Sequence, residues 1–385
     1  MKISEAIKYV GVNDLKIDLF EGQFDVPDGM AYNSYVIIDE KVCVMDSVDS
    51  SFGDVWLSNI EKALGGRSAD YLVVQHMEMD HSSNILRFSQ KYPEAKIVSS
   101  KMAFTMMKNM FGTDFAEKQI VVQEGSELNL GEHCLSFVGA ANVHWPEVIV
   151  SFEKKEGVLF SADAFGKFGA NGEIESDWVC EARRYYFGIV GKFGANVQTL
   201  LKKASNLEIK TICPLHGPVL FENIAYYLSL YDIWSRYEPE TNGIAIAYTS
   251  VYGHTKEAAE KLYSLLKEKG CQSVSIFDIA RSDMYECIED AFRYSTLVLA
   301  TTTYNGGIFP IMRDFVERLS ERNFQKRRVA FIENGSWAPM AAKALESAFS
   351  QCKDIDIVGK ISIKIALSAE NEKSLEELSD TLLKE

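Results

Sequence analysis

Four residues of the kinds that bind metal ions lie within residues 74–81: His76, Glu78, Asp80 and His81. The apolar run at residues 71–74 precedes them and is typical of a buried strand, and residues 82–88 resemble the start of a helix. The four side chains therefore fall on a strand-to-helix loop, where a rigid scaffold can aim them at one point. The chain has six histidines, and two of them lie here among carboxylates. This concentration favours a metal site over a polar surface loop.

Three further candidate ligands are placed in the same way, after apolar runs that end at residues 138, 162 and 213: His144, Asp163 and His216. If those strands lie side by side, all seven side chains converge on one edge of the sheets. Four imidazoles and three carboxylates are more than one ion would use, and they suit a binuclear site with a carboxylate bridge. His133 ends no comparable run, so we expect it to lie on the surface without a role.

The chemistry of this ligand set indicates which metals it would hold. Three anionic oxygens and no thiolate favour hard, redox-capable ions such as iron or manganese. Zinc stays open as an alternative, because it also accepts histidine and carboxylate ligands.

A second group of candidate residues lies in three loops of the C-terminal part. Residues 249–255 combine hydroxyls with backbone N–H groups at the start of a helix, an arrangement that binds phosphate. Residues 301–307 and 334–337 offer glycines that let the backbone approach a flat ring, and Tyr304 and Trp337 add aromatic surface. Ordinary turns and a helix cap are the alternative. The candidate cofactor-binding residues are Thr249, Ser250, Val251, Tyr252, Gly253, His254, Thr255, Thr302, Thr303, Tyr304, Asn305, Gly306, Gly307, Asn334, Gly335, Ser336 and Trp337.

The elements that position these residues differ between the two parts of the chain. Short strands dominate up to about residue 240, with helices expected at residues 51–65, 82–92 and 101–110. After a polar linker, strand and helix alternate five times, with strands at 244–249, 273–278, 296–300, 328–333 and 360–365. This alternation is the pattern of a doubly wound parallel sheet, which binds ligands at the carboxyl ends of its strands. We expect two domains, residues 1–240 and 241–385.

The composition excludes several functional classes. A net charge of −15 argues against a nucleic-acid partner, because no basic surplus exists to meet phosphates. No apolar stretch is long enough to span a membrane, and the N-terminus has no signal-peptide pattern. Seven dispersed cysteines without a Cys-x-x-Cys pair favour a cytoplasmic protein with no iron–sulfur or rubredoxin site of its own. We expect the basic cluster at residues 326–328 to be solvated surface.

The ligand spacing resembles the metallo-β-lactamase superfamily, and Glu78 in place of the more usual histidine resembles the flavodiiron proteins. The segments at residues 32–35 and 144–146 are also similar to that family, and residues 249–255 resemble the phosphate loop of flavodoxins. Over essentially the whole chain, the resemblance implies a fold that is both α+β and α/β. A metallo-β-lactamase-like αββα sandwich would be followed by a flavodoxin-like doubly wound parallel sheet.

The family resemblance also implies the cofactors, FMN and two iron ions. One iron would take His76, Glu78 and His144, the other Asp80, His81 and His216, and Asp163 would bridge them. Tyr185 or Tyr186 would supply a hydroxyl near the substrate, although simple packing is an equal alternative for both. The missing Gly-x-Gly-x-x-Gly motif argues against NAD or FAD in the second domain.

The activity that the resemblance implies is reduction of dioxygen to water, of nitric oxide to nitrous oxide, or of both. We expect electrons from a separate donor, rubredoxin or a similar carrier, to pass through FMN to the irons. A head-to-tail homodimer, or a dimer of dimers, would bring the FMN of one subunit to the irons of its partner. Two other classes stay open: a zinc hydrolase fused to a flavodoxin, and a non-catalytic electron carrier or gas sensor.

Overall fold

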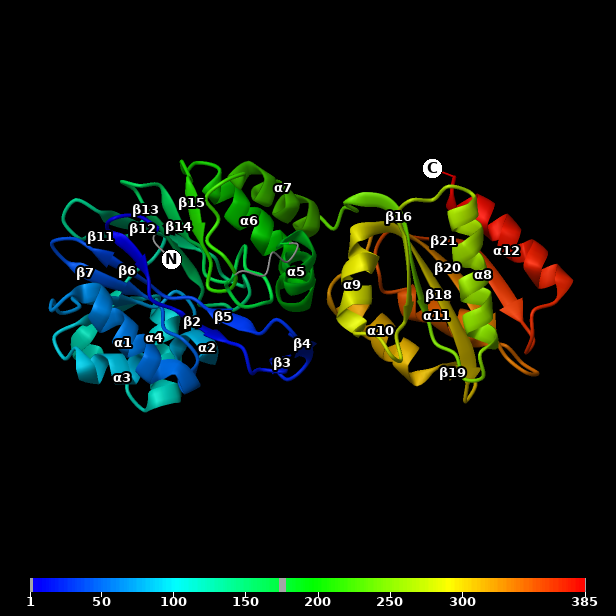
Figure 1. The fold of residues 1–385 in the computed structure, drawn as a ribbon, viewed down its shortest axis with the longest axis horizontal. Helices are drawn as coiled ribbons and strands as arrows, with labels where there is room; N and C mark the ends of the chain where they lie inside the picture. Colours follow the sequence, from blue (N-terminus) through cyan, green and yellow to red (C-terminus); the bar gives the residue numbers. More distant parts are fainter. Residues whose placement is uncertain (1–2, 173–177, 385) are drawn as a thin grey trace. The chain divides into compact units, whose positions relative to one another are not determined.

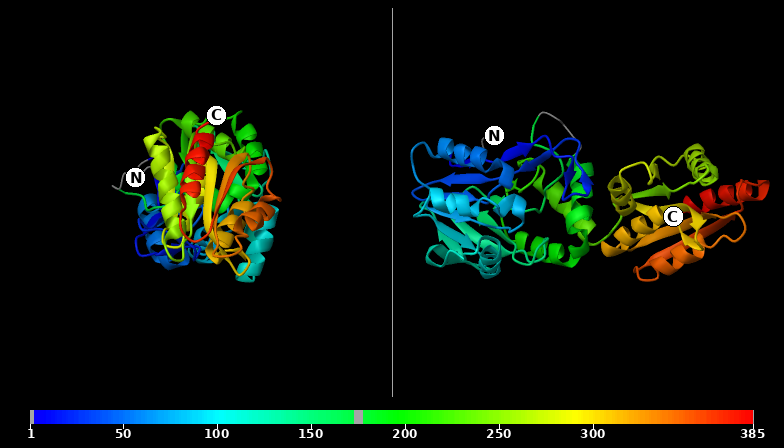
Figure 2. Two further views of the ribbon diagram at one scale, coloured as in Figure 1. Left: turned by 90° about the vertical axis from the view of Figure 1, so that its right-hand side faces the viewer. Right: turned by 90° about the horizontal axis from the view of Figure 1, so that it is seen from below.

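The structure, a computed structural model, describes residues 3–172 and 178–384. The contacts divide the chain into two compact units. The first comprises Met1–Tyr186 and Ala195–Asp232, and the second comprises Phe187–Gly194 and Ile233–Glu385. The sheets and helices of each unit can be followed in Figures 1 and 2. The predicted boundary at residue 240 stays a prediction.

The first unit contains two larger sheets, one of six strands and one of five. The strands of the six-stranded sheet lie in the order β1 (Ile7–Tyr9), β6 (Tyr35–Ile38), β7 (Val42–Met45), β8 (Tyr71–Val73), β9 (Lys96–Ser99), β10 (Gln119–Val121). Those of the five-stranded sheet lie in the order β11 (Glu127–Asn129), β12 (Cys134–Gly139), β13 (Ile149–Glu153), β14 (Val158–Phe160), β15 (Thr211–Cys213). Two short pairs complete it: β2 (Val12–Asp14) with β5 (Met30–Tyr32), and β3 (Leu19–Phe20) with β4 (Phe24–Asp25).

The core of the first unit lies between its two larger sheets. Val73 and Val98 from the first sheet and Phe137 and Phe160 from the second belong to one buried cluster. Helices cover the outer faces (Figure 1). They are α1 (Gly53–Leu64), α3 (Ile85–Lys91) and α4 (Lys101–Phe111) beside the first sheet, and α6 (Gly194–Ala204) and α7 (Ile224–Ser235) beside the second. The short helix α2 (Met79–Ser82) and α5 (Trp178–Tyr185) lie nearer the candidate ligands. The predicted αββα sandwich is confirmed.

The second unit is a parallel sheet with helices on both faces, as predicted. Its strands lie in the order β17 (Val274–Asp278), β16 (Thr241–Tyr248), β18 (Tyr294–Tyr304), β20 (Arg327–Asn334), β21 (Ile355–Ile363), with β19 (Gly307–Ile308) paired to β18. By sequence rank this order is 2-1-3-4-5, the flavodoxin arrangement. The helices are α8 (His254–Glu268), α9 (Met284–Arg293), α10 (Pro310–Glu321), α11 (Ala341–Phe349) and α12 (Ala369–Leu382).

The last strand begins five residues earlier than expected, at Ile355 rather than Lys360. β21 forms the edge of the sheet and is half exposed along most of its length. Polar residues such as Asp356 are therefore tolerated in this edge strand. Because of them, the first half of the strand does not form the apolar run that predicts a buried strand.

The second unit includes a short segment that precedes α6 in the sequence. Phe187 stacks on Phe292 of α9, with ring centroids 4.0 Å apart and an interplanar angle of 11°. The hydroxyl of Tyr237 donates to the carbonyl of Gly191 at 2.8 Å, and Arg322 donates to the carbonyl of Gly188 at 3.2 Å. Aromatic packing and backbone hydrogen bonds thus join Phe187–Gly194 to this unit.

The expectation that residues 326–328 are solvated surface is wrong for Arg327, which is 2% exposed. Its guanidinium donates to the carbonyls of Tyr237, at 2.7 Å, and Phe292. Burial lowers the pKa of Arg327 to about 10, although Glu238 and Glu240 oppose the shift. The residue therefore stays charged at neutral pH and satisfies backbone carbonyls at the amino end of β20. Lys326 pairs with Glu238 at 2.5 Å, so it is not a free surface charge either.

The expectation that His133 lies on the surface is also wrong, because the residue is 4% exposed. Its Nδ1 lies 2.8 Å from Oδ2 of Asp39, which also accepts the backbone N–H of His133 at 2.6 Å. Its Nε2 lies 3.3 Å from Glu156. The sequence does not reveal this pairing, because His133 lies in a polar turn and its partner Asp39 is far away in the sequence.

We predict that Asp39→Asn removes a stabilisation that depends on pH. Burial alone would raise the pKa of Asp39, but the hydrogen bonds from His133 lower it below its ordinary value of 3.8. A carboxyl whose pKa is lower in the folded state stabilises the fold above its unfolded pKa, and the effect disappears as pH falls through the folded pKa. Denaturant unfolding should show a stability gap between parent and variant at about pH 6 that narrows below about pH 4. A gap independent of pH would contradict the prediction.

Among the described residues, no helix is both long and apolar enough to cross a membrane.

Candidate metal centre and cofactor cavity

All seven predicted ligands follow strands whose carboxyl ends meet at one edge of the first unit. His76 and Glu78 lie in the loop after β8, and Asp80 and His81 lie on α2, the short helix that this loop enters. The other three come from the second sheet: His144 lies between β12 and β13, Asp163 follows β14, and His216 follows β15. The structure brings these residues together in two clusters.

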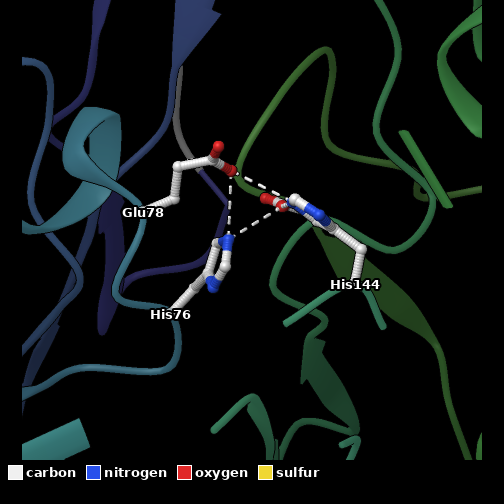
Figure 3. Close-up of side chains that lie close together, drawn as sticks. His76, Glu78 and His144 are labelled. Atoms are coloured by element: carbon white, nitrogen blue, oxygen red, sulfur yellow. Dashed lines mark hydrogen bonds and ion pairs between the residues drawn. The ribbon is translucent and has the colours of Figure 1, made fainter. Parts of the chain in front are cut away.

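The first cluster contains His76, Glu78, His144 and one oxygen of Asp163. Oε2 of Glu78 lies 3.2 Å from Nε2 of His76 and 3.0 Å from Nε2 of His144. Oδ2 of Asp163 lies 3.3 Å and 3.1 Å from the same two nitrogens. Figure 3 shows the side chains of His76, Glu78 and His144 pointing toward one another. Two carboxylate oxygens and two imidazole nitrogens therefore surround one point.

The second cluster contains Asp80, His81 and His216. Oδ2 of Asp80 lies 3.2 Å from Nε2 of His81 and 3.3 Å from Nε2 of His216. The two Nε2 atoms are 2.9 Å apart. Two imidazole nitrogens this close need a proton or a cation between them, because their lone pairs would otherwise face each other.

Asp163 lies between the two clusters. Its Oδ2 faces His76 and His144, and its Oδ1 lies 3.7 Å from Nε2 of His81 and 3.9 Å from Nε2 of His216. Asp163 is 1% exposed. Each oxygen of this one carboxylate is thus directed at a different cluster, which is the geometry that a bridging ligand requires.

The electrostatics of the clusters fit bound cations. Burial alone would lower the pKa of His144, but the carboxylates of Asp163 and Glu78 raise it to about 9. Burial alone would raise the pKa of Asp163, but His76 and His144 hold it well below 3.8. Among the described residues, no oxygen of Asp80 or Asp163 accepts a well-formed hydrogen bond. These buried anionic oxygens need compensating positive charge, which two metal cations would supply.

The two tyrosines proposed near the substrate have different surroundings. The ring of Tyr185 lies 5.5 Å from that of His216, between centroids. Burial raises the pKa of Tyr185 well above 10, and Asp163, Glu78 and Asp80 add to the shift. Tyr186 instead packs against Tyr231, at a centroid distance of 5.1 Å. Tyr185 therefore lies beside the clusters with its hydroxyl protonated. One ring contact of Tyr186 is with Tyr231, which is not a predicted ligand.

In the second unit, the three predicted loops surround a cavity of about 470 Å³ at the carboxyl ends of the strands. This volume is within the range of cofactor sites. Trp337 is 87% exposed and Tyr304 46% exposed, so both offer aromatic surface at the cavity. The predicted residues that line it are Ser250, Val251, Tyr252, His254, Thr255, Thr302, Thr303, Tyr304, Asn305, Gly306, Asn334, Gly335, Ser336 and Trp337.

Three predicted residues, Thr249, Gly253 and Gly307, do not line the cavity, and three others that sequence reasoning missed do. Thr249 is 1% exposed, and its hydroxyl bonds that of Thr301 at 2.7 Å. Gly253 is the N-cap residue of α8 and has a φ of 96°, a backbone conformation that glycine adopts without strain. The missed residues are Ala338, Met340 and Ile365. Ile365 could have been predicted, because it follows the last strand and so lies at the carboxyl edge of the sheet, where such sheets bind ligands.

Comparison with known proteins gives two matching family descriptions. Residues 30–217 match the ODP family beta lactamase, and residues 245–357 match a flavodoxin domain. The first match contains all seven predicted ligands, and the second contains the three predicted loops.

Several relatives match most of the chain. A nitric oxide reductase from Moorella thermoacetica is 28% identical over 91% of this chain and 90% of its own length. An anaerobic nitric oxide reductase flavorubredoxin from Vibrio vulnificus is 25% identical over 87% of this chain and 70% of its own length. A diflavin flavoprotein from Nostoc sp. is 27% identical over 98% of this chain, which spans 66% of the length of that protein.

Solved structures show the same fold over nearly the whole chain. The rubredoxin oxygen:oxidoreductase from Desulfovibrio gigas has a TM-score of 0.91 and 23% identity, and it covers 99% of this chain and 97% of its own. The flavodiiron protein from Giardia intestinalis has a TM-score of 0.91 and 24% identity, with coverage of 99% and 96%.

Proposed function

The chain belongs to the flavodiiron protein family, and we propose that it reduces dioxygen to water, nitric oxide to nitrous oxide, or both. Electrons would pass from an external donor, rubredoxin or a similar carrier, through FMN in the second unit to two iron ions in the first. The single observation that carries the proposal is Asp163, whose two oxygens face two separate ligand clusters. A bridged pair of ions, rather than one ion, fits that arrangement.

The side chains of the first unit would hold the two ions in different ways. His76, Glu78 and His144 would bind one, Asp80, His81 and His216 the other, and Asp163 both. When bound, the iron pair supplies redox-active positions for the gas, and FMN carries electrons singly or in pairs. Tyr185 keeps its proton at neutral pH, so it can donate a hydrogen bond beside the clusters but does not act as a base. Five of the seven ligands are buried, which limits the access of bulk water to the centre.

Two observations favour this function over a zinc hydrolase. Glu78 adds a third carboxylate to the set, and hard anionic oxygens suit iron. The cavity in the second unit has the size and the loops of a flavin site, which hydrolysis would not need. An electron carrier without catalysis would not need seven ligands, five of them buried.

The test is to reduce the purified protein anaerobically and measure consumption of each gas, with rubredoxin as the electron donor. We expect about two irons and one FMN per chain and rapid consumption of at least one gas. Zinc without iron would support the hydrolase, and failure to consume either gas would support the carrier. The ratio of the two rates gives the preferred substrate.

We predict that Thr255→Val weakens FMN binding by about 10–100-fold, since a hydrogen bond to a charged group contributes about 1.5–3 kcal/mol. Thr255 is the second residue of α8 and is 2% exposed, and its hydroxyl lies 3.1 Å from that of Thr302 at the cavity. Flavin fluorescence would give the dissociation constant.

Thr301→Val is the matched control for this substitution. Thr301 forms the parallel hydroxyl pair with Thr249 but does not line the cavity. It should therefore leave FMN affinity unchanged. Equal effects of the two substitutions would contradict a direct contact between Thr255 and FMN.

We also propose a head-to-tail homodimer, or a dimer of dimers, in which the FMN of one subunit serves the irons of its partner. A variant without His216 and a variant without a functional FMN loop should each be inactive. Mixing them under subunit exchange should restore part of the activity, because one site of each kind is then intact across the interface. Mixed dimers that form but show no activity would exclude electron transfer between subunits.

A further inference from the structure

One buried carboxylate outside the seven predicted ligands contacts the first cluster from behind. Glu147 is 3% exposed and lies just before β13. Its Oε1 is 2.9 Å from Nδ1 of His76 and accepts the backbone N–H of Met77 at 2.8 Å. Nε2 of the same imidazole faces Glu78 and Asp163. The ring of His76 is thus held between a carboxylate on one side and the proposed metal position on the other.

This contact determines which nitrogen of His76 carries the proton. An ionised carboxylate only accepts hydrogen bonds, so Nδ1 must be the donor, and the lone pair of Nε2 is left for a metal ion. A carboxylate behind a ligating histidine also fixes the ring orientation and raises the basicity of the ring. Glu147 is itself held in place, because its backbone carbonyl accepts the hydroxyl of Ser100 at 3.0 Å, and Ser100 caps α4.

The second cluster lacks this feature among the described residues. Nδ1 of His216 donates to a neutral backbone carbonyl, that of Ala31, at 2.7 Å. Nδ1 of His81 has no hydrogen-bond partner in the described part of the chain. The first cluster therefore has a charged group behind one of its histidines, and the second does not.

We propose that Glu147 is a positioning residue, which fixes the tautomer and orientation of His76 and makes the first cluster the tighter of the two metal positions. This inference rests on the proposed function to the extent that it requires two ions per chain. It adds an eighth residue to the centre, acting through His76 rather than on the substrate, and it makes the two metal positions unequal.

The test is calorimetric titration of the metal-free protein with Co²⁺ under anaerobic conditions, for the parent and for Glu147→Gln. Glutamine keeps the size of the side chain and one oxygen acceptor, so it removes mainly the charge. We expect the parent to bind two ions of unequal affinity. In Glu147→Gln the tighter one should weaken by about 10–100-fold, the usual effect of losing an outer partner, and the other should be unchanged.

Glu153→Gln is the matched control, because Glu153 is 0% exposed and its carboxylate accepts the backbone N–H groups of Lys155 and Glu156 rather than contacting a predicted ligand in the described part of the chain. It should leave both Co²⁺ affinities unchanged. Unchanged Co²⁺ affinities in Glu147→Gln, or equal weakening of both ions, would overturn the inference about Glu147. The proposed function would still stand in that case if the parent binds two ions. A parent that binds fewer than two ions would overturn both.

Discussion

Asp163→Asn should lower gas consumption by more than about 100-fold, since removing even an outer partner of a metal ligand costs about 10–100-fold in affinity or activity. The substitution keeps the shape of the side chain but removes its charge. One of its two terminal atoms becomes an amide group, which cannot face the histidines as an acceptor. Because Oδ1 and Oδ2 face different clusters, both metal positions lose affinity at once. Metal analysis should show less iron per chain, and gas electrodes should show the lost rate.

The flavin provides the internal control for this variant. The predicted FMN loops belong to the second unit, so FMN content and its absorption spectrum should stay as in the parent. A variant that keeps two irons and the parental rate would show that Asp163 does not bridge. Loss of FMN together with iron would indicate general misfolding instead.

Trp56→Ala should lower the unfolding free energy of the first unit by about 3–5 kcal/mol, the usual cost of removing a large buried aromatic ring. Trp56 of α1 is 0% exposed and packs near Phe88, with ring centroids 6.0 Å apart. Its indole N–H donates to the hydroxyl of Ser34 at 2.9 Å, so the substitution also leaves a buried acceptor without a donor. For a unit of this size the thermal midpoint should fall by on the order of 10 °C, which calorimetry would measure.

Trp337→Ala is the matched control, because Trp337 is 87% exposed. It should change the stability of the FMN-free protein by no more than about 0.5 kcal/mol, as is usual for surface substitutions. It should nevertheless weaken FMN binding, since the indole borders the cavity. Comparable losses of stability in both tryptophan variants would contradict the burial of Trp56.

The fold and the ligand clusters were predictable because both depend on local patterns that repeat. Each ligand follows an apolar run, and parallel strands place their carboxyl ends at a common edge, so sequence order predicts spatial convergence. The same reasoning predicted the cavity loops, but it did not show that the hydroxyl of Thr249 turns inward toward Thr301 and away from the cavity lining. Which way a side chain turns depends on its neighbours in space, and periodicity does not contain that information.

The residues that sequence reasoning placed wrongly are those whose partners are distant in the chain. His133 pairs with Asp39, and Arg327 donates to carbonyls of Tyr237 and Phe292. Charged residues in short polar runs look like surface, and their burial becomes visible only when the partner is known. Glu147 escaped notice for the same reason, because it contacts His76 across 71 positions of sequence.

The segment Phe187–Gly194 limits how freely this protein can exchange parts with its relatives. A recombination that replaces everything after residue 240 would leave Phe187 facing a new α9, and its stacking on Phe292 would survive only if the incoming helix offered a similar ring. The carbonyl of Gly188 would likewise need a new donor in place of Arg322. A chimera should therefore take this eight-residue segment from the same parent as the flavodoxin-like unit on which the segment packs.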